Sequence, residues 1–318
     1  MRLKMWRKSG QILSVKGKKG YFDVSYGVDS QSQKLDVWLP EGNGPFPAII
    51  SIHGGGYIAC DKRQDEMITP MLNGLNKGYA VIGINYRLST ETPFPYPVRD
   101  IKQAIRYIRA NAKSLNIDPE KIVLWGGSAG GYMTLMGCLC TDEEFFDNEY
   151  DPNKNISAKV CGGVTWYAHT DFTKCDEQLQ VNHIINVSLG IETTDINEEY
   201  EPVIGCLESS EFPFHDLDDS MSSLFANTSL ANPDESIEKV SPINYIHKNM
   251  PKIFMQHGSA DEIIPMQQSI NFALKANKIC GEERVKLEII PNAIHSSILF
   301  ETDENVEKVF SFINELLS

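Results

Sequence analysis

Short apolar runs alternate with stretches of helical periodicity along most of the chain. The runs at 47–52, 80–84 and 121–125 are largely continuous, which is typical of strands buried on both faces of a parallel sheet. Apolar residues within 101–108 fall at positions i, i+3, i+4 and i+7, which predicts an amphipathic helix packed on such a sheet. Strands that alternate with helices predict an α/β fold, with a mostly parallel central sheet and helices on both faces.

Weaker patterns extend this arrangement toward both ends of the chain. Residues 21–26 and 34–39 alternate between apolar and polar positions and predict a hairpin at the sheet edge. A turn is expected at 118–120, and a helix is expected to follow the small residues at 126–131. Further strands are expected at 160–168, 252–256 and 285–290, and further helices at 64–76, 265–277 and 305–317.

Residues 169–241 break this alternation. Acidic, polar and aromatic residues mix there without a strand pattern, over a length that is unusual for a plain connection. We expect a lid of short helices, inserted into a single domain that spans residues 1–318. A chain of 318 residues is longer than most single domains, but α/β enzymes often reach this length with one core and one insertion.

The composition is that of an ordinary globular protein, with 42% apolar and 23% charged residues. The net charge of −14 argues against a nucleic-acid partner. The seven cysteines are scattered without a paired motif and are expected to be reduced. Neither a signal peptide nor a run of about 18 apolar residues is evident, so we expect a cytoplasmic protein without a membrane partner. By base rate alone, a homodimer is the expected oligomer.

A serine flanked by glycines stands between a predicted strand and a predicted helix. The motif G-x-S-x-G matches residues 126–130 and identifies Ser128 as a candidate nucleophile. Such a hydroxyl needs a strained turn and a nearby base, and the flanking glycines let helix and strand approach closely. The alternative is a phosphate-binding turn, which would require the lysine of G-x-x-x-x-G-K-[ST]; this segment has none.

A run of three glycines follows the strand predicted at 47–52. The order His53-Gly54-Gly55-Gly56 matches the H-G-G-G run whose backbone amides bind an oxyanion in lipases and esterases. Each such donor can stabilise the developing negative charge by about 3 to 4 kcal/mol in a dry site. A flexible turn is the alternative, but the position at a strand end, before Ser128, favours an oxyanion site.

Taken together, these motifs resemble the hormone-sensitive-lipase-like branch of the α/β-hydrolases and related small esterases that act on acylated carbohydrates. The resemblance covers residues 20–318 apart from the insertion, and includes Tyr86-Arg87-Leu88, the segment 257–261 and His295. It implies the α/β-hydrolase fold, a Ser-His-Asp triad, and an oxyanion hole. The triad would be Ser128, Asp261 and His295, and the oxyanion hole the amides of Gly55, Gly56 and Ala129. The sequence departs from the family pattern at Asn85, where Asp usually precedes Tyr-Arg, and at Asn292, where Gly often precedes the catalytic histidine.

Position along the chain points to the same three side chains without the resemblance. Asp261 and His295 each follow a predicted strand, so both are expected at the sheet edge that carries Ser128. His295 would act as general base while Asp261 holds its tautomer. The rival acids are Asp171, Asp176 and Glu262. The other histidines are expected to anchor loops (His53, His257) or to lie in or beside the insertion, on the surface or in packing (His169, His183, His215, His247).

The predicted chemistry is hydrolysis of a small-molecule ester by way of an acyl-enzyme. Tyr57 follows the oxyanion glycines and Trp166 lies in the strand predicted at 160–168, so both are expected to contact substrate. No apolar lipase-like lid is evident, which favours short, acetyl-like acyl groups, and the resemblance adds acylated carbohydrates. No metal-ligand spacing or dinucleotide motif is present, so no metal and no cofactor are expected. Amidase, formamidase or peptidase activity and non-catalytic ligand binding are the alternatives.

Overall fold

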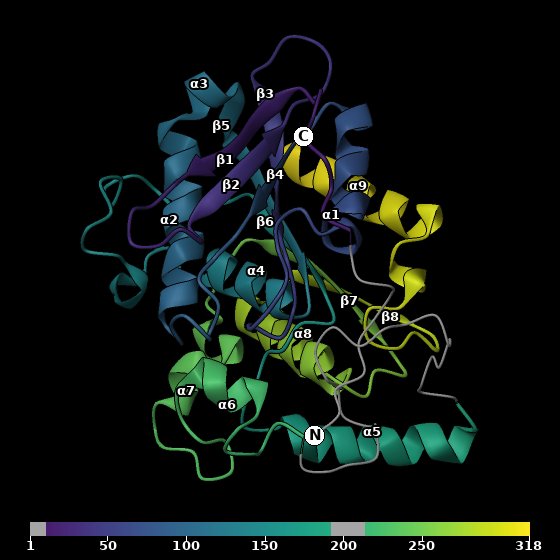
Figure 1. The fold of residues 1–318 in the computed structure, drawn as a ribbon. Helices are drawn as coiled ribbons and strands as arrows, with labels where there is room; N and C mark the ends of the chain where they lie inside the picture. The colour runs from purple at the N-terminus through teal and green to yellow at the C-terminus, as the bar shows by residue number, and fades with distance from the viewer. Residues whose placement is uncertain (1–10, 192–213) are drawn as a thin grey trace.

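A twisted sheet runs through the middle of the molecule (Figure 1). The computed structural model describes residues 11–191 and 214–318, and in these residues the strands join in the order β1-β2-β4-β3-β5-β6-β7-β8. The pairs β1/β2 and β2/β4 are antiparallel and all others are parallel, as the sequence predicted. The strands are β1 (Gly20–Ser25), β2 (Lys34–Trp38), β3 (Phe46–Ile52), β4 (Ala80–Ile84), β5 (Ile117–Gly127), β6 (Gly162–Trp166), β7 (Lys252–Gly258) and β8 (Val285–Ile290).

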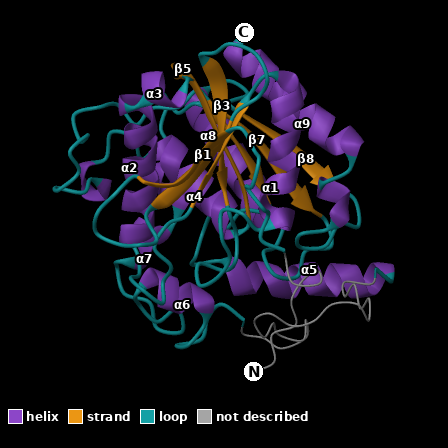
Figure 2. Cartoon of the chain, turned by 45° about the horizontal axis from the view of Figure 1, so that its top comes forward, coloured by secondary structure: helices purple, strands orange, loops and turns teal. Residues whose placement is uncertain are grey.

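Helices cover both faces of this sheet (Figure 2). One face packs against α2 (Tyr96–Ala110), α4 (Ala129–Leu139) and α8 (Gln267–Cys280), and the other against α1 (Asp65–Leu72) and α9 (Asp303–Leu317). Neighbouring strand residues divide between the two cores, as Ile49 and Ile50 do, because successive side chains of a strand point to opposite faces. The remaining helices outside the insertion are short: η1 (Asn73–Lys77), α3 (Ala112–Leu115), η2 (Glu144–Phe146), η3 (Pro242–Tyr245) and η4 (Ile298–Phe300).

The segment Tyr86-Arg87-Leu88 connects β4 to the start of α2. Arg87 forms a two-point ion pair with Asp100, with Nε to Oδ2 at 2.9 Å and Nη2 to Oδ1 at 2.6 Å. Gln33 donates a further hydrogen bond to the same carboxylate at 2.8 Å. Since Asp100 is fully buried, this network fixes the helix against the sheet, which is the structural role of the motif.

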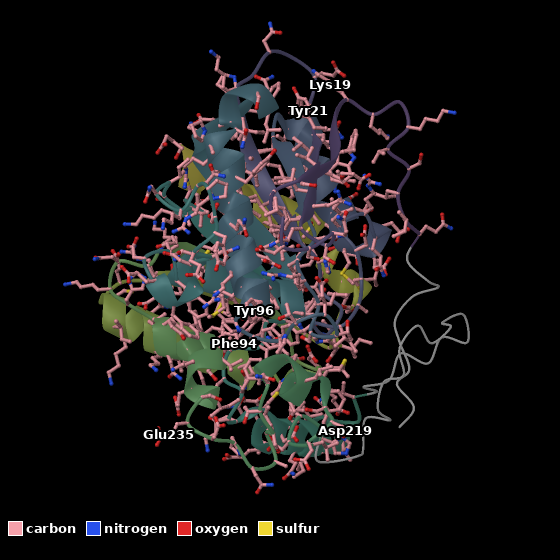
Figure 3. The ribbon with its side chains drawn as sticks, turned by 60° about the vertical axis from the view of Figure 1, so that its left-hand side comes forward. Lys19, Tyr21, Phe94, Tyr96, Asp219 and Glu235 are labelled. Carbon is pink, nitrogen blue, oxygen red and sulfur yellow. The ribbon has the colours of Figure 1, made fainter. Side chains whose placement is uncertain are left out.

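The described part of the insertion lies at one end of the sheet. It contains α5 (Cys175–Leu189), α6 (Met221–Ala226) and α7 (Ile237–Val240), and α5 is longer than the short helices we expected. Residues 192–213 of the expected lid lie outside the described part of the chain. Figure 3 places Asp219 and Glu235 at the end of the molecule opposite Lys19 and Tyr21. Phe94 joins the insertion to the main core, since its amide donates to the carbonyl of Phe225 at 2.8 Å.

No helix within 11–191 and 214–318 combines the length and the hydropathy that a membrane span requires.

Candidate active site

Five neighbouring parallel strands, β3, β5, β6, β7 and β8, end at the same edge of the sheet. The loops that follow them carry the glycine run 54–56, Ser128, Tyr167, Asp261 and His295, in that order. The insertion lies at this edge (Figures 1 and 2). Ligands of parallel α/β sheets bind outside the carboxyl ends of the strands, so the topology gathers the candidate side chains where a ligand would bind.

Ser128 occupies a strained turn between β5 and α4. Its φ of 55° and ψ of −125° are rarely adopted by a non-glycine residue, and its amide donates to the carbonyl of Trp166 at 2.9 Å. A Cβ on Gly126 would lie 2.4 Å from the carbonyl oxygen of Gly130, and one on Gly130 would lie 2.0 Å from that of Ile52. Only glycine therefore fits on either side of the serine, which is the physical content of the G-x-S-x-G pattern.

The structure brings Ser128, His295 and Asp261 into one chain of hydrogen bonds. Nε2 of His295 lies 3.0 Å from Oγ of Ser128, and Nδ1 of His295 lies 2.7 Å from Oδ2 of Asp261. Asp261 is fully buried and His295 is 7% exposed. The distances have the range of hydrogen bonds between a nucleophile, a base and the group that orients the base.

Local contacts keep the Asp261 carboxylate ionised. Burial alone would raise its pKa, but the charge of His295 and hydrogen bonds from His257 and His295 outweigh burial, so its pKa lies well below the ordinary value. Oδ1 also accepts the backbone N–H groups of Ile263 and Ile264, both at 2.9 Å. A fixed negative charge therefore faces Nδ1 of His295.

Two further histidines anchor these loops. His257 is fully buried, with Nδ1 bonded to the hydroxyl of Ser269 at 2.7 Å and Nε2 to the carbonyl of Ile264 at 2.8 Å. His53 donates from Nδ1 to the carbonyl of Gly54 at 2.9 Å and stacks on Tyr86 at 4.5 Å between ring centroids. Burial lowers the pKa of His53 to about 4, so this ring is neutral near neutral pH.

The glycine run packs directly against the serine turn. A Cβ on Gly54 would lie 3.0 Å from the carbonyl oxygen of Gly127 and 3.3 Å from Cβ of Ser128. Gly55 and Gly56 have φ values of 99° and 58°, and in the described part of the chain their amides donate to no backbone acceptor. Ala129 is the first residue of α4, so its amide has no acceptor within the helix. These three amides lie on the two segments that meet beside Ser128.

The two expected substrate contacts lie in packed surroundings. Tyr57 is 4% exposed and stacks on Phe225 at 4.0 Å between ring centroids. The indole of Trp166 donates to Oε1 of Gln256 at 2.8 Å and packs edge-on against Trp125, within the core on the α1 and α9 side. Trp166 reaches the serine turn through its backbone carbonyl. A direct substrate contact of either side chain stays a prediction.

Other residues also lie close to Ser128, Asp261 and His295. The ring of Tyr167 lies 4.7 Å from that of His295, and its φ is 40°. Its position directly after β6 was a usable signal, because the loops after the strands of this sheet carry the other candidates. Asn182 and His215 contact the loop of Asp261 from the insertion, and no local pattern marked them.

The described residues contain no group of three His, Cys, Asp or Glu side chains arranged to hold a metal ion.

Comparison with known proteins matches residues 35–276 to the family described as BD-FAE. The chain is 23% identical over 271 residues to the probable carboxylic ester hydrolase LipM of Mycobacterium tuberculosis, which covers 84% of this chain and 54% of that protein. The chain thus spans about half the length of this curated relative.

Solved structures show the same architecture. A truncated form of a carbohydrate esterase from gut microbiota superposes with a TM-score of 0.74 and 22% identity, over 94% of this chain and 96% of that one. A thermophilic esterase of Thermogutta terrifontis with bound butyrate gives a TM-score of 0.67 and 21% identity over 94% of each chain.

Proposed function

Because the chain belongs to the BD-FAE family of α/β-hydrolases, we propose that it hydrolyses short-chain carboxylic esters with Ser128 as the nucleophile. The fold is the α/β-hydrolase fold that the sequence predicted. The observation that carries the proposal is the continuous hydrogen-bonded chain from the Asp261 carboxylate through His295 to the Ser128 hydroxyl. The strained, glycine-flanked turn directs a hydroxyl toward an imidazole, and side-chain packing does not require such strain, which is typical of functional sites.

In the proposed reaction, Oγ of Ser128 attacks the ester carbonyl carbon while Nε2 of His295 takes its proton. The carbonyl oxygen becomes an oxyanion and accepts hydrogen bonds from the amides of Gly55, Gly56 and Ala129. His295 then protonates the leaving alcohol, and the acyl group stays on Ser128. Water, deprotonated by His295, attacks the acyl carbon; the bond from that carbon to Oγ of Ser128 then breaks, His295 returns the proton to Oγ, and the acid leaves. Asp261 holds the tautomer of His295 and stabilises its charged form throughout.

Aromatic packing beside the oxyanion loop favours short acyl groups. Tyr57 follows Gly56 directly and belongs to a cluster of contacting rings with Tyr132, Phe172 and Phe225. All four rings are buried. Packed rings next to the oxyanion glycines restrict the length of chain that fits there, so we propose acetyl-like to butyryl-like groups. The butyrate complex of the Thermogutta terrifontis esterase agrees with this range.

For the alcohol part, we propose an acylated carbohydrate. Support comes from the name of the solved neighbour, a carbohydrate esterase from gut microbiota, and from the sequence resemblance to such esterases. Sugar esters are neutral, so the net charge of −14 does not oppose their binding.

Hydrolysis of p-nitrophenyl acetate, butyrate, octanoate and laurate tests the proposal. We expect turnover of the acetate and the butyrate, falling steeply at octanoate, and loss of activity in Ser128→Ala by about 1,000-fold or more. Ser311→Ala, at an exposed serine on α9, is the matched control and should keep full activity. If no ester is turned over while anilides or formamides are, the chain is an amidase or a formamidase instead.

A further inference from the structure

The loop that carries Asp261 is held by side chains of the insertion. Nδ2 of Asn182 donates to the backbone carbonyl of Asp261 at 2.7 Å, and Nε2 of His215 donates to that of Ile263 at 2.9 Å. The loop therefore has two differently bonded sides. Its amides at Ile263 and Ile264 turn inward to the Asp261 carboxylate, whereas its carbonyls at Asp261 and Ile263 face the insertion.

Both donors are buried and fixed in orientation. Asn182 is fully buried and His215 is 5% exposed. Nδ1 of His215 lies 2.6 Å from the hydroxyl of Ser222, which can donate to it and so leaves the hydrogen on Nε2, toward Ile263. The carboxylate of Asp176 accepts the backbone N–H groups of 214–216 at 2.8 to 3.0 Å, which ties the segment of His215 to the start of α5.

A separate apolar cluster joins the same two parts. Cys175 and Leu179 of α5 pack with Phe214 and Ile264, apart from the two cores that flank the sheet. One more polar contact lies at its rim, where Nδ1 of His183 is 3.1 Å from the side chain of Glu262. Polar and apolar contacts thus meet on the few residues that follow Asp261.

We propose that the insertion clamps the catalytic-acid loop and that Asn182 and His215 are positioning residues for Asp261. This inference rests on the proposed function, since it assigns a second role to the insertion within that reaction. Without these donors, the buried carbonyl of Asp261 and the partly buried carbonyl of Ile263 would each lose its partner, so the loop would shift to find others. A shift of about 1 Å at a catalytic group can cost about 100-fold in rate.

A residue that positions Asp261 (a clamp) and a residue that contacts the substrate (a pocket wall) affect the kinetics differently. A clamp acts through Asp261, so its loss lowers kcat for every acyl length and leaves KM nearly unchanged. A residue of the pocket wall contacts the substrate, so its loss changes KM and the ratio of the activities on the acetate and butyrate esters. If Asn182 acts only through the Asp261 carboxylate, its replacement should have little effect on kcat once that carboxylate has been removed. A double-mutant cycle measures this difference.

The test compares Asn182→Leu with the matched control Asn186→Leu. Asn186 lies on the same helix and is also buried, but it donates to the side chain of Glu262 and not to the backbone of Asp261. We expect Asn182→Leu to lower kcat by about 10- to 100-fold on both p-nitrophenyl acetate and butyrate, with KM within about twofold of the wild type. Asn186→Leu should keep kcat within about threefold of the wild type. In the Asp261→Asn background, adding Asn182→Leu should change kcat by less than about threefold.

A raised KM with unchanged kcat, an altered acetate-to-butyrate ratio, or an equal loss in the Asp261→Asn background would overturn the clamp. Thermal melting checks that each variant is folded. If Asn182→Leu does not fold, His215→Leu and His215→Gln replace it, because glutamine keeps a donor and should retain more activity than leucine. A wild type that hydrolyses neither ester contradicts the proposed function itself, whereas a working wild type with an unaffected Asn182→Leu contradicts the clamp alone.

Discussion

At the residue scale, His169 has the least satisfied surroundings near the site. It is 1% exposed and stacks on Phe172 at 3.8 Å between ring centroids, and neither ring nitrogen has a hydrogen-bond partner among residues 11–191 and 214–318. Burial and the neighbouring His215 hold its pKa well below the ordinary value, although the backbone of Asp171 favours the protonated ring. His169 is therefore a neutral, buried polar group without a partner in the described part of the chain, which costs stability.

Replacement of His169 by leucine should stabilise the protein. Leucine has a similar volume and no polar atom, so the change removes an unsatisfied group that costs about 1 to 3 kcal/mol. Differential scanning calorimetry should show a Tm higher by about 2 to 4 °C for each kcal/mol gained. His247→Leu, at an exposed histidine, should leave Tm unchanged. A lower Tm in His169→Leu alone would show that stacking outweighs the unpaired nitrogens.

Sequence could predict the residues of the site whose constraints are local. Ser128 needs glycines two positions away on each side, and Asp261 and His295 follow strands of one parallel sheet, so motif and periodicity were enough to bring them together. Asn292, a departure from the family pattern, has a φ of 59°, which asparagine tolerates better than most residues, so it serves where glycine is usual.

Residues whose role depends on distant packing could not be predicted. Asn182 contacts a loop 79 positions away in the chain, and nothing in its neighbourhood marks it. Asn85, the other departure, accepts the amide of Lys62 at 2.6 Å and donates to Asp61 at 2.7 Å, which requires both an acceptor and a donor on one side chain. An aspartate there would lack the donor when ionised.

At the element scale, apolar runs predicted the central strands well. They did not predict the start of β5, where its pairing with β3 is irregular. We expected a turn at 118–120, but β5 already begins at Ile117, which pairs with Phe46. The register then shifts, so that Ala48 pairs with Ile122 and the intervening residues of β5 lie outside the regular ladder. Such an irregular stretch tolerates Pro119, which cannot donate to the ladder, and it has the same sequence pattern as a turn.

The insertion was the other element-scale failure. We expected short helices, but α5 has 15 residues. Its amphipathic pattern is blurred because it carries large apolar side chains on its exposed side as well as on its buried side; the exposed ones are Val181, Ile184, Ile185, Val187 and Leu189. Periodicity predicts a helix only when one face is apolar and the other polar, so it gave no signal here.

At the scale of the whole molecule, buried neutral histidines should make the protein sensitive to acid. Burial lowers the pKa of His53 to about 4, of His169 well below its ordinary value, and of His215 below its ordinary value. The unfolded chain binds protons at these positions from about pH 6.5 downward, and the folded chain does not. Stability conferred by their neutral forms is present above about pH 6.5 and is lost as the pH falls.

Each of these histidines should lower the free energy of unfolding by up to about 1.4 kcal/mol per pH unit below about pH 6.5. Glu66 partly offsets this, because burial raises its pKa to about 7 and the folded state then holds the extra proton. Urea unfolding at about pH 7 and about pH 5.5 should show a net loss of stability. His169→Leu should reduce the loss in free energy of unfolding between these two pH values by the contribution of one histidine. An unchanged pH dependence would mean that the ring of His169 is protonated in the folded state.

The central claim is that Ser128 is a nucleophile activated by His295 and Asp261, and covalent labelling tests it most directly. Intact-mass measurement and peptide mapping after incubation with diethyl p-nitrophenyl phosphate should reveal one diethylphosphoryl group, on Ser128, in the wild type. Ser128→Ala should stay unlabelled, and His295→Ala should react at least about 1,000-fold more slowly, since the base is gone. An unlabelled wild type, or a label that persists in Ser128→Ala, would contradict the account.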